Sequence, residues 1–486
     1  MVGYSGAFEK MILKLKTKPW PHQLDAINFA IEKPSSMLAL SMGYGKSKVV
    51  IDILENREHK RVLIVCPKSV IAVWPKQFAT HASSQWEMAL LDQGDSKRKA
   101  ARIKAGLLST RFVAVTNYDA YWREPLAATI LGTPWDCIVL DESHRIKAPG
   151  GRAAWFAKKL RATQKLALTG TPMPHSPLDV YGQFRFLNPE IFGTNFTLFR
   201  SRYAIMGGYE GHQVVGFARL DELHRKFYSI AFRADADLGL PEASHIERTF
   251  KLSAPAMRVY RELERELVAE VGSGVVHAGN ALTKLLRLQQ ITSGCVPVET
   301  LDDGMNKMVH QKEVDTEKRR LLQDVLEDLD PKEPVVVFCR FRNDLDQIKA
   351  VTESLSRSHG ELSGRANDLS DWQAGQRTVL GVQIQSGGLG VDFTRARYAI
   401  YFSLGFSLGE YEQSLARIHR PGQLRPCFYV HLIAEGTVDV KVYSALEKKK
   451  DVVEYVLNDW NHKGQEDCES GYAEAEAIHG AGAPAP

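Results

Sequence analysis

The residues best suited to chemistry lie in a glycine turn between a short apolar run and a helix start, at residues 38–50. Gly43 and Gly45 allow the backbone to bend tightly and to turn its N–H groups toward a polyphosphate at the positive end of that helix. Lys46 adds a mobile charge for the outer phosphates, and Ser47 adds a hydroxyl ligand for Mg²⁺. We therefore expect a nucleotide-phosphate loop here. The alternative is a glycine turn before an ordinary helix.

Two carboxylates, Asp141 and Glu142, directly follow the apolar run at residues 135–140. A carboxylate at the end of a buried strand is costly unless it has a partner. Mg²⁺ held by Ser47 and the nucleotide is the expected partner of Asp141, which leaves Glu142 to orient or deprotonate the attacking water. The alternative is a solvated strand end followed by a helix cap.

Two hydroxyl groups, those of Thr169 and Thr171, lie on a tight turn after the run at residues 166–168. They can hydrogen-bond His144 or Glu142 and so link the nucleotide state to the surrounding fold. A plain turn would have a similar sequence, so this element has weight only in combination with the others.

Near the C-terminus, a helix expected from Glu410 carries Gln413, Arg417 and Arg420 at spacings of four and three residues. That spacing predicts one shared helix face, and guanidinium groups are rigid, permanently charged forks suited to phosphate. The alternative is a solvated helix side that ends at Pro421.

The surrounding elements predict an α/β fold. Unbroken apolar runs at residues 61–67, 112–118, 135–140 and 166–168 alternate with helical patterns, which indicates a parallel sheet covered by helices. A second alternating region begins near Pro334, with strands expected at residues 335–340, 378–385 and 398–402. The region between them is expected to be a mostly helical insert, with helices at residues 257–271 and 281–290, and a closing helix is expected at residues 438–457. Ligands of such sheets bind at the carboxyl ends of the strands.

Length and composition bound the function class. The chain has 486 residues, enough for two or three domains, with 44% hydrophobic and 25% charged residues. The net charge of +4 is mild, and no apolar run approaches the ~20 residues needed to cross a bilayer. The six cysteines form no C-x-x-C pair, so a zinc site or disulfide framework is disfavoured. The N-terminus shows no signal pattern, so we expect a cytoplasmic location, in a bacterial cell or a phage-infected host.

Taken together, these motifs resemble those of superfamily 2 helicase-type ATPases, in particular the Swi/Snf-related DNA translocases of the short phage and bacterial type. The resemblance covers residues 18–450 and rests on an ordered set: Gln23, residues 42–47, 141–147, 168–172, 387–392, 413–417 and 419–423. The stretches Asp-Glu-x-His-Arg-Ile-Lys and His-Arg-x-Gly-Gln indicate the Swi/Snf branch rather than RNA helicases.

The resemblance implies two RecA-like parallel-sheet lobes with ATP between them and duplex DNA across both. It implies domains at residues 1–185, 186–315 and 316–460, followed by a disordered tail at residues 461–486. The residues that it implies for catalysis are Lys46, Asp141, Glu142, Arg417 and Arg420, with Ser47 and Asp141 on the metal. Those implied for ATP binding are Gln23, Met42, Gly43, Tyr44, Gly45, Lys46, Ser47, Gly390, Asp392 and Gln413. His144, Thr169 and Thr171 would couple the nucleotide state, and Lys68, Thr116, Gln385 and Ser386 would contact the DNA backbone without reading sequence.

The chain departs from the family pattern at four positions. Leu40 replaces the first glycine of the full phosphate-loop pattern, Ser41 an acid, Ser47 a threonine, and Ser143 a glycine or alanine. Leu40 counts against the phosphate-loop prediction, whereas the three serines are compatible with ATP hydrolysis. The sequence shows no histone-reading or nuclease module, so any target would come from a protein partner.

We expect a DNA-stimulated ATPase that translocates on duplex DNA. The alternatives are a strand-separating DNA or RNA helicase and a non-catalytic binding module.

Overall fold

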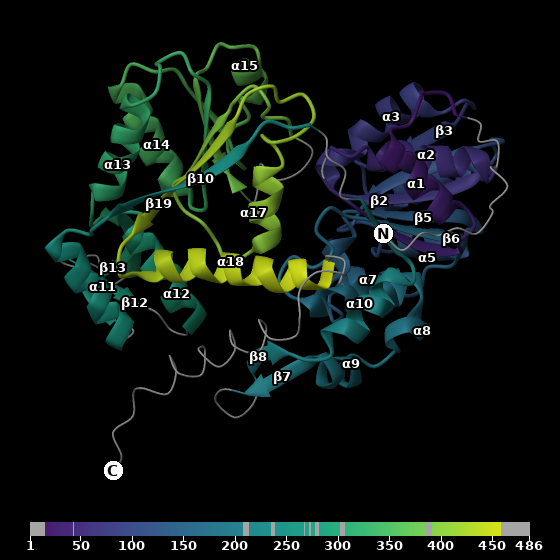
Figure 1. Ribbon diagram of the computed structural model, residues 1–486, viewed down its shortest axis with the longest axis horizontal. Coiled ribbons are helices and arrows are strands. Elements are labelled where there is room, and N and C mark those ends of the chain that lie inside the picture. The colour runs from purple at the N-terminus through teal and green to yellow at the C-terminus, as the bar shows by residue number, and fades with distance from the viewer. Residues whose placement is uncertain are drawn as a thin grey trace. The chain divides into compact units, whose positions relative to one another are not determined.

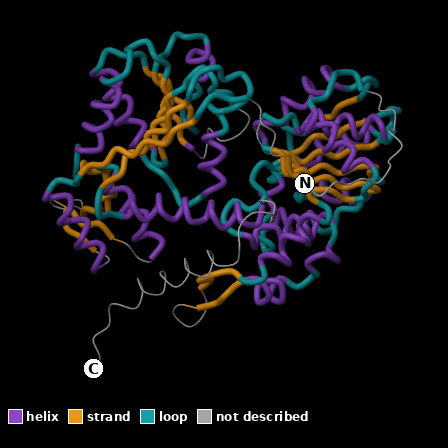
Figure 2. Tube along the Cα trace, in the orientation of Figure 1, coloured by secondary structure: helices purple, strands orange, loops and turns teal. Residues whose placement is uncertain are grey.

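The computed structural model describes residues 15–41, 43–207, 213–234, 239–266, 268–271, 274–277, 281–301, 307–384 and 391–457. The chain divides into two compact units. The first comprises residues 1–40, 47–233 and 449–486, and the second comprises residues 41–46 and 234–448. Figure 2 shows strands at the centre of each unit with helices around them. No helix of the described residues has the length and apolar character to cross a membrane.

The first unit is built on a seven-stranded sheet in the order β3-β4-β2-β5-β6-β1-β9. Each of the pairs from β3 to β1 is parallel, so the carboxyl ends of these strands share one edge. The Val-, Ile- and Leu-rich strands are buried because helices cover them, as their unbroken apolar runs predict. The strands are β1 (Ser35–Leu40), β2 (Arg61–Cys66), β3 (Glu87–Leu90), β4 (Phe112–Asn117), β5 (Trp135–Asp141), β6 (Ala162–Leu168) and β9 (Ala231–Ala234).

Helices and short turns connect these strands, and a two-stranded antiparallel ribbon precedes β9 along the chain. The helices and turns are α1 (Pro21–Ile31), α2 (Lys46–Asn56), η1 (Lys68–Val73), α3 (Trp74–His81), α4 (Ser96–Gly106), α5 (Leu126–Gly132), η2 (Ser143–Ile146), α6 (Arg152–Ala157), η3 (Pro177–Asp179), α7 (Val180–Leu187), α8 (Pro189–Phe192), α9 (Phe196–Tyr203) and α10 (Leu220–Tyr228). The ribbon consists of β7 (Ala204–Gly207) and β8 (Gln213–Phe217).

The second unit contains a six-stranded, wholly parallel sheet in the order β10-β19-β18-β15-β17-β16. Its strands are β10 (Ala243–Phe250), β15 (Val335–Cys339), β16 (His359–Leu362), β17 (Val379–Gln383), β18 (Tyr398–Tyr401) and β19 (Cys427–Ala434). In Figure 1, α13 (Glu317–Glu327) and α14 (Arg342–Ser354) lie on one side of this sheet and α17 (Leu408–Leu415) on the other. Apolar side chains of α13 and α14 form one core cluster with β15, β17 and β19. The prediction of two parallel-sheet, RecA-like lobes is therefore confirmed.

The segment between the two central sheets contains strands as well as helices. Helices predominate in residues 177–228, as predicted, although this stretch also contains the ribbon of β7 and β8; β9 joins the first sheet and β10 the second. The helix expected at residues 257–271 is shorter than predicted, because α11 (Ala254–Glu266) ends before β11 (Val268–Val271), which pairs with β12 (Gly274–His277). A four-stranded antiparallel sheet, β11-β12-β13-β14, includes β13 (Cys295–Leu301) and β14 (Lys307–Glu313). The expected domain boundaries remain predictions, and the expected disordered tail lies outside the described residues.

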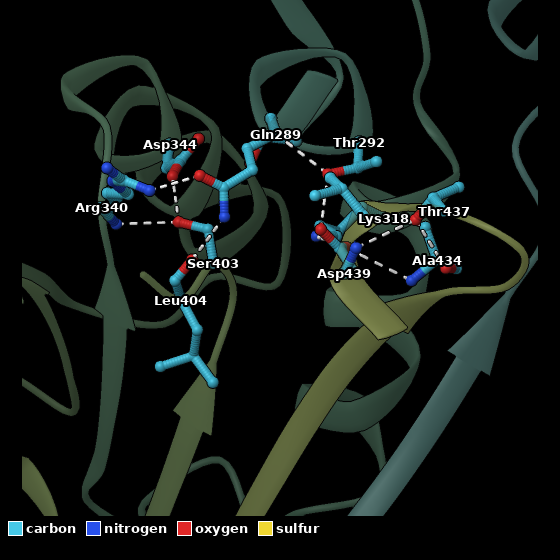
Figure 3. Close-up of polar contacts among 12 residues, drawn as sticks. Gln289, Thr292, Lys318, Arg340, Asp344, Ser403, Leu404, Ala434, Thr437 and Asp439 are labelled. Carbon is cyan, nitrogen blue, oxygen red and sulfur yellow. Dashed lines mark hydrogen bonds and ion pairs between the residues drawn. The ribbon is translucent and has the colours of Figure 1, made fainter. Parts of the chain in front are cut away.

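A buried polar network ties α12 (Ala281–Thr292) to the carboxyl edge of the second sheet (Figure 3). Arg340, just after β15, donates to the Gln289 side chain, and the Gln289 amide donates to the Leu404 carbonyl at 2.9 Å. Ser403, just after β18, donates to Asp344, and burial raises the pKa of Asp344 to about 6. These bonds fix α12 to two strand ends at once.

The other half of the network centres on Asp439 in α18 (Val438–Leu457). Its carboxylate accepts hydrogen bonds from the Thr292 hydroxyl and the Lys318 ammonium, each at 2.7 Å. Lys318 is only 2% exposed, so Asp439 neutralises a buried charge while it joins α12, α13 and α18. The described part of this unit also contains α15 (Leu369–Gln373).

Candidate active site

The phosphate loop joins the end of β1 to the start of α2, as the sequence predicts. Gly43 and Gly45 have φ values of +84° and +74°, a conformation that residues with a Cβ rarely adopt. The Lys46 ammonium donates to the carbonyl of Ser41 at 3.4 Å, and Ser47 lies in the first turn of α2. The loop therefore presents backbone N–H groups, a lysine and a hydroxyl at a helix N-terminus, the arrangement that favours anions. Met42 lies outside the described residues.

Asp141 is the last residue of β5, and Glu142 follows it at the carboxyl edge of the sheet. Each residue is 7% exposed. Glu142 has a φ of +53°, a left-handed conformation that costs a non-glycine residue about 1–3 kcal/mol. Among the described residues, the buried Oε2 atom of Glu142 has no hydrogen-bond partner, and it lies 3.5 Å from His144 Nδ1. A strained backbone therefore holds a buried carboxylate oxygen that a water molecule can satisfy.

The turn after β6 contacts His144, which lies in the turn that carries Glu142. The Thr169 hydroxyl lies 3.1 Å from His144 Nδ1 and accepts a hydrogen bond from the backbone N–H of Thr171 at 3.1 Å. The Thr169 N–H donates to the carbonyl of Leu38 in β1, at 3.3 Å. Thr169 is thus bonded both to the turn that carries Glu142 and to the strand that leads into the phosphate loop.

Gln183 in α7 is a residue of this region that the sequence motifs did not reveal. It is fully buried, its Oε1 accepts from the Ser143 hydroxyl at 2.7 Å, and its Nε2 donates to the carbonyl of Pro172 at 2.7 Å. One side chain therefore joins the turn after β5 to the turn after β6. The only available sequence signal is a polar residue within an apolar helix, which requires buried partners.

The remaining predicted residues of the first unit have contrasting environments. Gln23 is 3% exposed, and its Oε1 accepts from the backbone N–H of Trp20 at 3.0 Å, which caps α1. Lys68 is exposed directly after β2, at the carboxyl edge of the sheet. Thr116 is completely buried in β4, and its hydroxyl is inaccessible to a partner in this conformation. The expected contacts of Lys68 and Thr116 with the DNA backbone remain predictions.

In the second unit, the predicted helix face is not formed. Gln413 lies on α17 and is buried, but α17 ends at Leu415, so Arg417 and Arg420 lie beyond it. The Arg417 carbonyl accepts from the Phe393 N–H at 3.0 Å, because residue 421, its partner in a continued helix, is a proline without an N–H. In addition, the Gln423 amide donates to the Ala396 carbonyl at 2.8 Å. Arg417 is nonetheless only 6% exposed.

The segment after β17 is described only in part. Asp392 is exposed, and its carboxylate accepts from the backbone N–H and hydroxyl of Thr394 at 2.8 and 2.7 Å. Gln385, Ser386 and Gly390 lie outside the described residues, so their expected roles remain predictions.

Stacked rings hold α17 against the second sheet. The Tyr411 hydroxyl lies 2.9 Å from His431 Nε2 and 3.3 Å from His245 Nδ1. His431 in β19 stacks on Tyr401 in β18, with ring centroids 4.9 Å apart. Burial lowers the pKa of His431 to about 3, so its imidazole is neutral at neutral pH. The helix that carries Gln413 is therefore positioned by buried, uncharged rings.

Comparison with known proteins adds family relationships to this geometry. Residues 20–296 match the model of the SNF2-related domain, and residues 317–422 match that of the helicase conserved C-terminal domain.

Two curated proteins and one solved structure are among the similar proteins. Putative protein p41 of Acyrthosiphon pisum secondary endosymbiont phage 1 is 27% identical, with 92% of this chain and 99% of p41 covered. The putative ATP-dependent helicase/translocase YwqA of Bacillus subtilis is 24% identical over 87% of this chain, which spans only 46% of the length of YwqA. The Sulfolobus solfataricus SWI2/SNF2 ATPase core in complex with dsDNA is 21% identical, with 92% of this chain and 94% of that chain covered and a TM-score of 0.42.

Proposed function

The chain belongs to the SNF2-related family and is an ATPase of the helicase/translocase type, and we propose that it couples ATP hydrolysis to translocation on duplex DNA. The observation that carries the proposal is the pair Asp141 and Glu142, buried at the carboxyl edge of the sheet that also carries the phosphate loop. The ordered Swi/Snf motifs of the sequence support duplex DNA as the track. The phage and bacterial sources of p41 and YwqA support the cytoplasm of a bacterial cell or a phage-infected host as its location.

In the proposed mechanism, the glycine loop and Lys46 hold the β- and γ-phosphates of ATP. Glu142 orients the attacking water through its buried Oε2 and accepts a proton from that water. The strained backbone at Glu142 keeps the carboxylate in place for this role. Gln23 contacts adenine, and Tyr44, Gly390, Asp392 and Gln413 complete the nucleotide contacts. Arg417 and Arg420 stabilise the charge of the transferring phosphoryl group, a role worth about 10³-fold or more in rate.

The donor set fits Mg²⁺. Ser47 and Asp141 offer a hydroxyl and a carboxylate, the hard oxygen ligands that Mg²⁺ takes together with substrate phosphates and water. Among the described residues no cluster of three His, Cys, Asp or Glu side chains could hold a metal ion without a nucleotide. Ser47 and Asp141 would hold the ion together with ATP, and the ion would neutralise charge on the phosphates.

His144, Thr169 and Thr171 are assigned to coupling. The bond between Thr169 and His144, and the bond from Thr169 to the end of β1, support a route between the Glu142 turn and the phosphate loop. Lys68, exposed at the carboxyl edge, is assigned to the DNA backbone, with Gln385 and Ser386 as the corresponding residues of the second unit. The opening and closing of the two lobes with each ATP cycle would move the DNA contacts.

The test measures ATP hydrolysis without nucleic acid and with single-stranded DNA, duplex DNA and RNA. We expect the largest stimulation with duplex DNA. We also expect Lys46→Ala and Glu142→Gln to abolish turnover, whereas Glu353→Gln, a change at an exposed glutamate, should leave it unchanged. Near-normal stimulated hydrolysis by Glu142→Gln would refute the site assignment.

A second pair of assays separates translocation from strand separation. Triplex displacement without forked-duplex unwinding would support translocation, and efficient fork unwinding would favour a strand-separating helicase.

A further inference from the structure

A buried tyrosine contacts the backbone at the catalytic carboxylates. Tyr118 follows β4, is 3% exposed, and donates its hydroxyl to the carbonyl oxygen of Asp141 at 2.8 Å. Burial raises the pKa of Tyr118 well above its usual range, so the hydroxyl remains a donor at all working pH values. β4 and β5 are not neighbours in the sheet, because β2 lies between them, so this bond crosses over the end of β2.

The acceptor of this bond, the Asp141 carbonyl, lies in the peptide group directly before Glu142. The carbonyl of Asp141 belongs to the peptide group that joins Asp141 to Glu142, and rotation of this group changes φ of Glu142. That φ is +53°, in the small left-handed region that a residue with a Cβ occupies only when its surroundings hold it there. A donor on the Asp141 carbonyl is therefore placed to maintain the conformation that directs the Glu142 side chain.

We infer that Tyr118 is a positioning residue for ATP hydrolysis, which fixes the peptide group between Asp141 and Glu142 and thereby the Glu142 carboxylate. The inference rests on the role proposed above for Glu142. It predicts a specific kinetic signature: loss of the hydroxyl misplaces the carboxylate for the chemical step, while the phosphate loop that binds ATP is untouched.

The same segment supplies a matched control. Tyr121 is also fully buried, its ring lies 5.9 Å from that of Tyr118, and its hydroxyl donates to a backbone carbonyl, that of Ala153 in α6. Tyr118→Phe and Tyr121→Phe each remove one buried hydroxyl and leave one carbonyl without that donor. Only Tyr118→Phe changes the peptide group before Glu142.

The experiment determines kcat and KM for ATP and the melting temperature of the full chain for the wild type, both tyrosine variants and Glu142→Gln. We expect Tyr118→Phe to lower kcat about tenfold with KM within about twofold, and Tyr121→Phe to keep kcat within about twofold, at a similar loss of melting temperature. Equal kcat for the two tyrosine variants, or a rise in the KM of Tyr118→Phe without a fall in its kcat, would overturn the inference about Tyr118 and leave the proposed function intact. Turnover retained by Glu142→Gln would overturn the proposed site and this inference with it.

Discussion

The hydroxyl of Ser143 donates a 2.7 Å hydrogen bond to the side-chain oxygen of Gln183, forty residues further along the chain. Because the Gln183 amide also donates to the Pro172 carbonyl, α7 is bonded to both turns that flank the candidate catalytic carboxylate. The serine that departs from the family pattern at this position therefore has a defined structural partner. A displacement of α7 would therefore disturb both turns.

Gly182→Ala should separate α7 from the turn after Glu142. A Cβ at position 182 would lie 2.0 Å from the carbonyl oxygen of Ile146, a backbone atom that cannot rotate away. We expect a loss of about 2–3 kcal/mol in the free energy of unfolding, measured by urea denaturation, together with reduced ATP turnover. Gly132→Ala is the control, since a Cβ there meets nothing within 4 Å, and it should change stability by no more than about 1 kcal/mol.

Lys68→Ala should weaken DNA binding equally for all sequences, because a phosphate contact carries no base information. If Lys68 neutralises one phosphate, the slope of log K against log salt concentration should fall by about 0.9. Fluorescence anisotropy with duplexes of unrelated sequence measures both effects. Lys60→Ala is the matched control, because Lys60 is also exposed but lies at the amino end of the same strand. Identical salt slopes for the two variants would contradict the proposed contact.

Asp439→Asn should destabilise the second unit strongly. The change leaves the Lys318 ammonium, 2% exposed, without its anionic partner at 2.7 Å. Removal of one partner of a buried ion pair costs about 3–5 kcal/mol, which thermal or urea unfolding would report. Glu353→Gln breaks an exposed pair with Lys349 instead, and it should cost less than about 1 kcal/mol. A loss as small as that of the control would show that Asp439 is not needed to hold Lys318 in place.

Acid should destabilise the protein in part through His431. Burial lowers the pKa of this imidazole from 6.5 to about 3 in the folded chain, so between these values the unfolded chain binds a proton that the folded chain does not. Stability is therefore lost as pH falls from about 6.5 toward 3, by about 2 kcal/mol for this group at pH 5.

His431→Phe keeps an aromatic ring but removes the titrating group. The difference in unfolding free energy between pH 7.5 and pH 5 should therefore shrink by about that amount, 2 kcal/mol. His310→Phe, at an exposed histidine, should keep the wild-type pH dependence. An unchanged pH dependence in His431→Phe would assign the acid sensitivity to other groups, of which His175, with a pKa lowered by burial to about 4, is the next to test.

The elements predicted correctly from sequence are those whose own residues determine them. The apolar runs that became β2 and β5 are buried on both faces, and α18 has the bounds that its spacing predicts. By contrast, the helical pattern at residues 257–271 extends beyond the real helix, since Val268–Val271 pairs with a strand that the pattern does not show. β10 was not predicted because it is a largely exposed edge strand with mixed polarity, defined by eight residues of pairing to β19.

In the candidate site, too, some features can be predicted from the local sequence and others depend on distant contacts. The phosphate loop and the two carboxylates are recognisable because their chemistry requires particular residue types at fixed spacing. The roles of Gln183 and Tyr118 depend on hydrogen bonds to residues 40 and 23 positions away, which no local spacing encodes. The helix predicted to carry Arg417 ends at Leu415, and the Arg417 carbonyl, which Pro421 cannot serve as a donor, accepts from the distant amide of Phe393 instead.

The edge strands β9 and β10 determine how this protein can be divided into fragments for separate study. A recombinant first lobe that stopped at residue 185 would lack β9 and leave Met37, whose N–H donates to the Ile230 carbonyl, without that acceptor. A second lobe begun at residue 316 would expose all eight residues of β19 that pair with β10. Bare edges of that kind recruit other chains, so truncations placed at the motif boundaries would be prone to aggregate, and soluble halves should carry their edge strands with them.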